Sequence, residues 1–101
     1  MTVVRYHPDA ADEVVAAVDY YASRDVDLAA RFDAELRDVE QRIRETAASY
    51  PVFERLGDVP VRRALMDDFP FALLFVEHAD TIWIIAVMHL RRAPGYWRAR
   101  V

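Results

Sequence analysis

The sequence predicts an α+β fold in which a two-helix antiparallel hairpin packs on a mostly antiparallel sheet, with the element order β-α-α-β-β-β. Two amphipathic helical patterns follow one another with only a short polar break between them. Three apolar runs of strand length come next, and the turns between them are too short for crossover helices. The chain has 101 residues, 54% of them hydrophobic, so we expect one domain, residues 1–101, with a single modest core.

The first half of the chain is predicted to form a short strand and two helices. Residues 2–6 are predicted to be a short strand, apolar and β-branched at Val3 and Val4, and we expect this strand at an edge of the sheet. Pro8 and Asp9 open the first helix, because Pro fits the first turn and an acid favours its positive end. Asp25 or Asp27 caps a second, longer helix. The first apolar stripe is Ala11, Val14, Val18 and Tyr21, with Val15 beside it, and the second is Leu28, Phe32, Leu36, Val39, Ile43 and Ala47.

Three acid–Arg pairs mark the opposite face of the second helix. In each pair the acid precedes the Arg by four residues, the order that stabilises a helix by about 0.2–0.5 kcal/mol. The pairs are Asp33 with Arg37, Asp38 with Arg42, and Glu40 with Arg44. We interpret this charge run as a solvated face and not as a site.

The second half of the chain is predicted to form most of the sheet. Tyr50-Pro51 ends the second helix, and residues 52–56 form a connector or a short strand. An antiparallel meander follows, with strands at residues 59–66, 71–78 and 81–90. The last two strands are apolar on both faces, with residues alternating between them. Because one helical hairpin covers only one face, either the C-terminal tail or a partner must cover the other.

The composition excludes several function classes. A net charge of −4 argues against a general nucleic-acid binder, because phosphate contacts favour a basic chain. The absence of cysteine and lysine excludes thiol and lysine chemistry and fits a reducing cytoplasm. The three His have no metal-ligand spacing and there is no Gly-rich phosphate loop, so we expect neither metal nor cofactor. Without a signal-like N-terminus or an apolar run of membrane length, we expect neither export nor a membrane role.

The predicted last strand and the residues after it concentrate the candidate binding residues. Arg and aromatic side chains are the usual anchors of protein–protein surfaces, and a rigid strand holds such groups in place. The candidates in this segment are His89, Arg91, Arg92, Tyr96, Trp97 and Arg98. Arg62, on an earlier predicted strand, joins this set if the fold brings the two strands together.

Several motifs, taken in order, resemble the RelE/ParE superfamily of toxins from type II toxin–antitoxin systems. Residues 4–10, VRYHPDA, resemble the family's strand that leads into a helix opened by Pro. Tyr20-Tyr21 and residues 30–36 resemble its helix pair, and Pro51 lies where the family has a Pro before the sheet. Residues 61–63, VRR, resemble its Arg-bearing strand. Residues 89–97, HLRRAPGYW, resemble the ParE-like ending H-x-R-R-x-P-x-Y-W.

The resemblance implies a bacterial toxin that a cognate antitoxin binds and neutralises, in a toxin–antitoxin hetero-oligomer without a cofactor. RelE-like members of the superfamily cut mRNA in the ribosomal A site, and ParE-like members poison DNA gyrase. A RelE-like activity would use Arg62, His89 and Arg92 as catalytic residues, with His89 as acid or base and the two Arg stabilising charge. A ParE-like activity needs no catalytic residue. Its target-binding surface would comprise Arg62, His89, Arg91, Arg92, Tyr96, Trp97 and Arg98.

The ParE-like branch is the favoured alternative. RelE-like enzymes resemble basic, Lys-rich RNA-binding proteins, whereas this chain is acidic and has no Lys. Ribosome-dependent mRNA cleavage is the second alternative, and a non-toxic interaction module on the same scaffold is the third. Each candidate residue also has a structural alternative. His89 would be a hydrogen-bonded strand end, Arg62 or Arg63 would pair with Asp67, Asp68 or Glu77, and Trp97 would pin the tail over the sheet.

Overall fold

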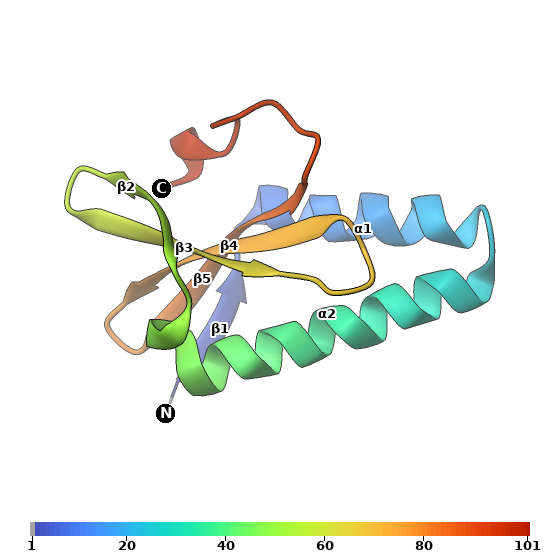
Figure 1. Cartoon of the computed structure of the whole chain (residues 1–101), viewed down its shortest axis with the longest axis horizontal. Coiled ribbons are helices and arrows are strands. Elements are labelled where there is room, and N and C mark those ends of the chain that lie inside the picture. Colours follow the sequence, from blue (N-terminus) through green and yellow to red (C-terminus); the bar gives the residue numbers. More distant parts are fainter. Residues whose placement is uncertain (1) are drawn as a thin grey trace.

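Two helices and a five-stranded sheet form the fold, as a computed structural model of the chain shows (Figure 1). The model describes residues 2–101. In chain order the elements are β1 (Val3–Tyr6), α1 (Pro8–Ala22), α2 (Val26–Thr46), β2 (Val52–Leu56), β3 (Val59–Leu65), β4 (Phe71–His78) and β5 (Thr81–His89), with short 3-10 helices η1 (Ala47–Ser49) and η2 (Arg98–Arg100). The predicted α+β fold, with its helical hairpin on a mostly antiparallel sheet, is therefore confirmed.

The strands lie in the order β1-β5-β4-β3-β2. The predicted meander is confirmed, because β3, β4 and β5 are antiparallel neighbours. β1 is an edge strand, as predicted, and it pairs in parallel with β5. The segment that the sequence left open as connector or strand is β2, the opposite edge.

The helices cover one face of the sheet, which we call the helix side. The apolar stripe of α2 is confirmed, since Phe32, Leu36, Val39 and Ile43 are buried, and Asp25 is its N-cap. In α1 the predicted residues Val14, Val18 and Tyr21 pack against the core, but the prediction is wrong at Ala11. Ala10 is buried in place of Ala11, and Val15 is 58% exposed. The buried residues of α1 are Ala10 and Ala17, and small side chains of this kind let a helix lie close to its neighbours.

Two of the three predicted acid–Arg pairs on α2 form. Asp33 bonds Arg37 at 2.9 Å, and Glu40 lies 3.5 Å from Arg44. Arg42 instead donates to the backbone carbonyl of Asp38 at 3.5 Å. These side chains lie at the solvent-facing side of the helix, as expected.

A β-bulge breaks the predicted alternation along β5. Leu74 of β4 lies opposite Ala86, but the next residue, Phe75, lies opposite Ile84, which leaves Ile85 as the extra residue. Ile84 and Val87 consequently pack in the helix-side core, whereas Ile85, Ala86 and Met88 pack on the other face. Every residue after the bulge faces the opposite side from the one that simple alternation predicts.

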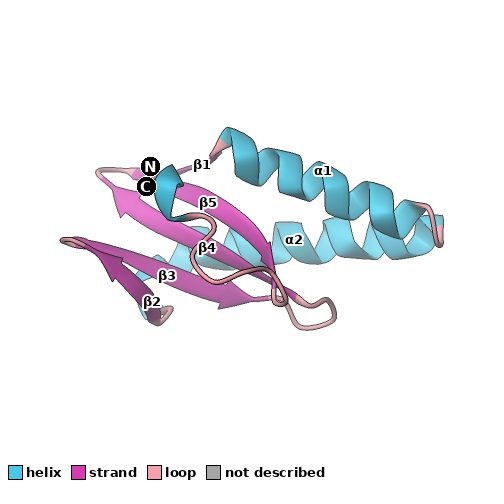
Figure 2. Cartoon of the chain, turned by 90° about the horizontal axis from the view of Figure 1, so that it is seen from above, coloured by secondary structure: helices cyan, strands magenta, loops and turns pink. Residues whose placement is uncertain are grey.

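The tail, residues 90–101, covers the second face of the sheet, which we call the tail side. Trp97 is 1% exposed there and packs with a cluster comprising Val61, Ala72, Leu74, Ile85, Ala86 and Met88. Figure 2 shows the sheet between α2 and the tail. The tail is thus one cover of this face, and Trp97 pins it. Within residues 2–101, neither helix combines the length and apolar character that a membrane span requires.

Candidate functional site

The carboxylate of Glu13 on α1 holds the tail in place. Its Oε2 accepts a hydrogen bond from the Tyr96 hydroxyl at 2.6 Å, and its Oε1 accepts one from Arg100 Nη1 at 2.8 Å. Oε1 also accepts the backbone N–H of Val87 at 3.0 Å, and Arg92 Nη1 lies 3.8 Å from Oε2. The Glu13 side chain is 13% exposed, so its charge is compensated by these partners more than by water.

This cluster completes a backbone edge that β1 leaves open. β1 pairs with β5 only as far as Ile84. Beyond that point Glu13 accepts from the N–H of Val87, and Arg100 Nη1 donates to the carbonyl of Ile85 at 3.0 Å. Glu13 and Arg100 thus bond backbone groups of β5 that a neighbouring strand would otherwise pair. They also join α1, β5 and the tail.

The electrostatics of the cluster favour a neutral Tyr96 beside charged Arg100. Burial and the hydrogen bond to the Glu13 carboxylate raise the pKa of Tyr96 well above its ordinary value. Burial lowers the pKa of Arg100, but the hydrogen bond and charge of Glu13 outweigh that effect and leave the pKa raised. The guanidinium of Arg92 stacks 3.9 Å from the centre of the Tyr96 ring, which is a cation–π contact.

His89 lies at the end of β5 on the helix side, where the bulge places it. Its Nδ1 accepts the backbone N–H of Arg91 at 3.1 Å, and its ring meets the Phe71 ring edge-on at 5.1 Å. A nitrogen that accepts a hydrogen bond carries no proton, so a neutral His89 carries its proton on Nε2. The strand-end interpretation of His89 is therefore supported by its hydrogen bond and its packing.

His89 and Arg92 line an open groove of about 570 Å³ between α1 and the ends of β4 and β5. The remainder of the lining is mainly apolar and aromatic: Ala16, Ala17, Tyr20, Tyr21, Pro70, Phe71 and Val87, with Glu13. Arg24 lies over the Tyr20 ring at 4.9 Å. The groove combines an apolar floor with Arg side chains nearby, the composition that protein interfaces favour.

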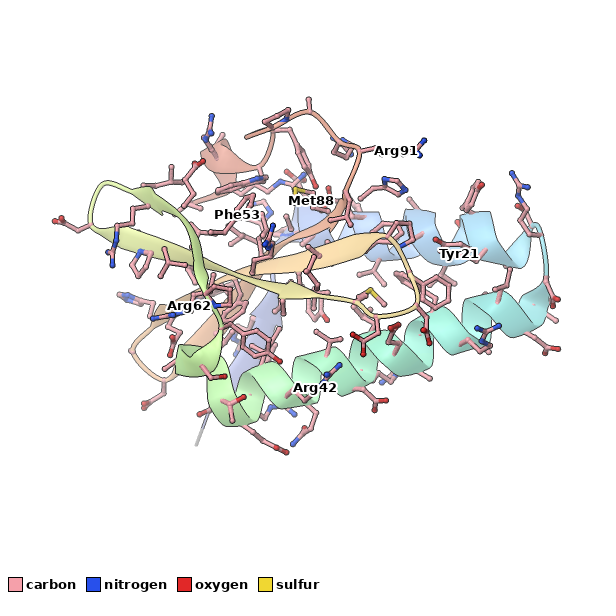
Figure 3. All side chains as sticks on the ribbon, viewed as in Figure 1. Tyr21, Arg42, Phe53, Arg62, Met88 and Arg91 are labelled. Atoms are coloured by element: carbon pink, nitrogen blue, oxygen red, sulfur yellow. The ribbon has the colours of Figure 1, made fainter. Side chains whose placement is uncertain are left out.

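Arg62 takes a structural position away from His89. Its Nη1 donates to the carbonyl of Tyr50 at 2.6 Å, and its Nε lies 3.7 Å from Glu77, one of the predicted structural partners. Arg62 lies opposite Phe75, which lies opposite Ile84. On β4, which has no extra residue there, four residues separate Phe75 from Phe71, the partner of His89, which is about 13 Å at about 3.3 Å per residue. Figure 3 shows Arg62 near the start of β2, well apart from Arg91.

The other candidates divide between surface and support. Arg91 is exposed, and Arg92 and Tyr96 stack beside it. Arg98 instead pairs with Glu54 of β2 through two hydrogen bonds of 2.5 and 2.8 Å, and the pKa of Glu54 is lowered chiefly by that hydrogen bond. Gly95 makes this possible, because its φ of 77° suits glycine and a Cβ there would meet the Arg98 side chain.

Glu13 is the residue that sequence reasoning missed. It lies among other acids on a solvated helix, and its partners Tyr96 and Arg100 are 83 and 87 residues away. No local pattern distinguishes such a side chain, because only the folded chain brings the three together. Across residues 2–101 there is no cluster of three His, Cys, Asp or Glu side chains that would hold a metal ion.

Comparisons with known proteins agree with this fold. A search of curated protein sequences finds no significant match. Among solved structures, a chain from the chromosomal ParDE toxin–antitoxin system of P. aeruginosa superposes with a TM-score of 0.71. It is 20% identical, and the match covers 88% of this chain and 96% of that one. Residues 4–94 match the family model described as the ParE toxin of the type II toxin–antitoxin system parDE. The chain therefore belongs to the ParE toxin family.

Proposed function

We propose that this ParE-family toxin acts by binding DNA gyrase through a non-catalytic surface at the tail. The observation that carries the proposal is the separation of the residues that RNA cleavage would require. Arg62 donates to the Tyr50 carbonyl at 2.6 Å and belongs to a strand level about 13 Å from His89. Phosphoryl transfer needs its acid–base and charge-stabilising groups around one phosphate. A binding surface has no such requirement.

The proposed target surface consists of His89, Arg91, Arg92 and Tyr96. Arg and Tyr are common anchors of protein interfaces, and the adjacent groove of about 570 Å³ would receive an apolar side chain of the target. Trp97 supports this surface from below, since it is 1% exposed. Arg98 ties the far end of the tail to Glu54.

We also propose that a cognate antitoxin neutralises the toxin in a hetero-oligomer, as expected of this family. The tail side offers one place for it. A second groove of about 430 Å³ is lined by the apolar side chains of Val59, Val76, Trp83 and Val101. Trp83 is 36% exposed. An antitoxin segment lying there would cover apolar surface that the tail leaves open. Gyrase as the target places the action of the toxin in the cytoplasm.

The test compares two reactions with the same purified toxin. Gyrase supercoiling of relaxed plasmid is measured beside cleavage of mRNA on translating ribosomes. We expect inhibited supercoiling with accumulation of cleaved DNA, intact mRNA, and relief when the antitoxin encoded beside the toxin gene is added. Cleavage of A-site mRNA that His89→Ala abolishes would establish the RelE-like alternative. Expression without any effect on growth, gyrase or mRNA would leave the non-toxic interaction module.

A further inference from the structure

We propose that Glu13 is the positioning residue of the target-binding surface. It acts through Tyr96, Arg92 and Arg100, and its own carboxylate is turned to them and not to the target. This inference rests on the proposed function for its consequence, the loss of gyrase inhibition. The structural part of the inference, that Glu13 orders the tail, rests only on the contacts of the tail.

Side chains hold the end of the tail on the body of the protein. Within the described part of the chain, the backbone hydrogen bonds of residues 93–101 stay inside that segment, for example from Arg98 to Gly95 and from Arg100 to Trp97. The attachments are the buried Trp97 ring, the Arg98–Glu54 pair, the contacts with Glu13, and the contacts of Arg100 with the Ile85 carbonyl and Asp9. Trp97 fixes the position of the segment but is apolar and does not orient the charged groups around it.

Glu13 is the attachment that contacts Tyr96 and Arg92 of the proposed target surface. The Tyr96 hydroxyl ends on Glu13 Oε2, and this fixes the ring on whose face Arg92 stacks at 3.9 Å. Arg100 lies 5.0 Å from the centre of the same ring, so two guanidinium groups share one aromatic ring. A carboxylate between them offsets their repulsion. If Glu13 is replaced by the uncharged Gln, the side chains of Arg92 and Arg100 repel one another beside the ring. Arg92 then leaves the orientation in which it faces the groove.

Glu13 also ties this arrangement to the rigid part of the fold. Its Oε1 accepts both the Val87 N–H of β5 and Arg100 Nη1, at 3.0 and 2.8 Å. Arg100 in addition lies 3.7 Å from Asp9, one helical turn before Glu13. The groove beside Arg92 has α1 and β5 as its walls. The Glu13 carboxylate therefore holds the tail at a fixed position relative to α1 and β5, the two elements that form the groove.

The experiment compares Glu13→Gln with Asp12→Asn. The amide of Glu13→Gln keeps the size of the side chain and one acceptor for Val87, but removes the charge. Asp12→Asn removes the same charge from the adjacent, exposed position of α1. Hydrogen–deuterium exchange of residues 93–101 measures tail order, and the toxin concentration that half-inhibits supercoiling measures function. We expect Glu13→Gln to raise both the exchange rate and that concentration by about tenfold or more, because charge-assisted hydrogen bonds are lost.

The matched variant and a double variant separate positioning from general stability. Asp12→Asn should leave both readouts at the wild-type level. Tyr96→Phe combined with Glu13→Gln should be little worse than Glu13→Gln alone, since the Tyr96 hydroxyl acts through its hydrogen bond to Glu13. If Glu13→Gln weakens stability at large, Tyr96→Phe removes only one hydrogen bond and should still raise tail exchange.

The outcomes for tail order and for the target are distinguishable. Wild-type exchange in residues 93–101 of Glu13→Gln overturns the inference, as does additive loss in the double variant. If wild-type toxin does not inhibit gyrase, the proposed function fails, and the exchange data alone decide whether Glu13 orders the tail.

Discussion

Ile84 and Val87 lie three residues apart on β5 and point to the same side of the sheet. The bulge at Ile85 makes this possible, because it inserts one residue opposite the Leu74–Phe75 step of β4. It also sends His89 to the helix side, into the groove beside α1. Had the strand alternated without interruption, His89 would face the tail side with Trp83 and Ile85.

The first prediction concerns the deletion of Ile85, the extra residue of β5. Deleting Ile85 would remove the extra residue and leave Ala86, Val87 and His89 on their native faces, so the protein should keep its cooperative unfolding transition and lose mainly the tail-side packing of Ile85. Ile85→Val keeps the extra residue and should cost only about 0.5–1.5 kcal/mol. Circular dichroism during urea denaturation measures both. A deletion variant that no longer unfolds cooperatively would show that the residues after the bulge do not keep their native faces.

Trp97 supplies a second prediction. Trp97→Ala should lower the free energy of unfolding by about 3–5 kcal/mol, because it empties the tail-side core. Trp97→Phe should cost much less, since the indole Nε1 is buried without a hydrogen-bond partner and its removal relieves an unsatisfied donor of about 1–3 kcal/mol. Trp83→Ala, at a side chain 36% exposed, is the control and should also cost less than Trp97→Ala. Urea denaturation gives all three values, and equal losses at both Trp positions would contradict the burial.

Arg62 should behave as a structural residue. Arg62→Ala should lower the free energy of unfolding by about 1–3 kcal/mol, because the Tyr50 carbonyl loses a charged donor. Inhibition of supercoiling per folded molecule should stay at the wild-type level. Arg63→Ala is the neighbouring control, since Arg63 stacks over Phe53 at 4.9 Å and should cost about 0.5–1 kcal/mol. If folded Arg62→Ala no longer inhibits gyrase, Arg62 contacts the target as the sequence suggested.

Stability should fall at alkaline pH through two tyrosines. Burial and Glu40 raise the pKa of Tyr6, and burial and Glu13 raise that of Tyr96, both above the ordinary 10.0. A pKa raised in the folded state gives stability that is complete below pH 10 and lost as pH rises above it. The chain has no Lys or Cys, so tyrosines are the side chains that titrate there. The urea midpoint of Tyr6→Phe/Tyr96→Phe should depend less on pH between about 9 and 11 than that of wild type.

Removing the tail should damage the fold as well as toxicity. Deletion of residues 96–101 removes Tyr96, Trp97 and Arg98, three residues that the sequence predicts for the target-binding surface, so we expect toxicity to be lost. The structure adds a consequence, because the deletion removes Trp97 and uncovers Ala72, Leu74 and Met88. We therefore expect the truncated protein to aggregate when purified alone, as exposed apolar patches promote association. Size-exclusion chromatography tests this, and a monodisperse truncated toxin would show that Trp97 is not needed to cover the sheet.

Local patterns in the sequence predict the elements of this protein and their order. Periodicity marked α2 and its buried face, Pro8 and Asp25 marked the starts of the helices, and short turns made β3, β4 and β5 neighbours. These signals are local, so they survive without knowledge of the fold. The motifs between residues 4 and 97, taken in order, predicted the family through resemblance, and the family match over residues 4–94 confirmed it.

Which side chains meet depends on the tertiary fold. The bulge at Ile85 places His89 on the helix side of the sheet. The pairing registers of β3, β4 and β5 separate His89 from Arg62. Glu13 became the anchor of Tyr96 and Arg100 through contacts across more than eighty residues, the separations being 83 and 87. Such contacts depend on the packing of α1 against β5 and of the tail over the sheet, and no short sequence pattern encodes that packing.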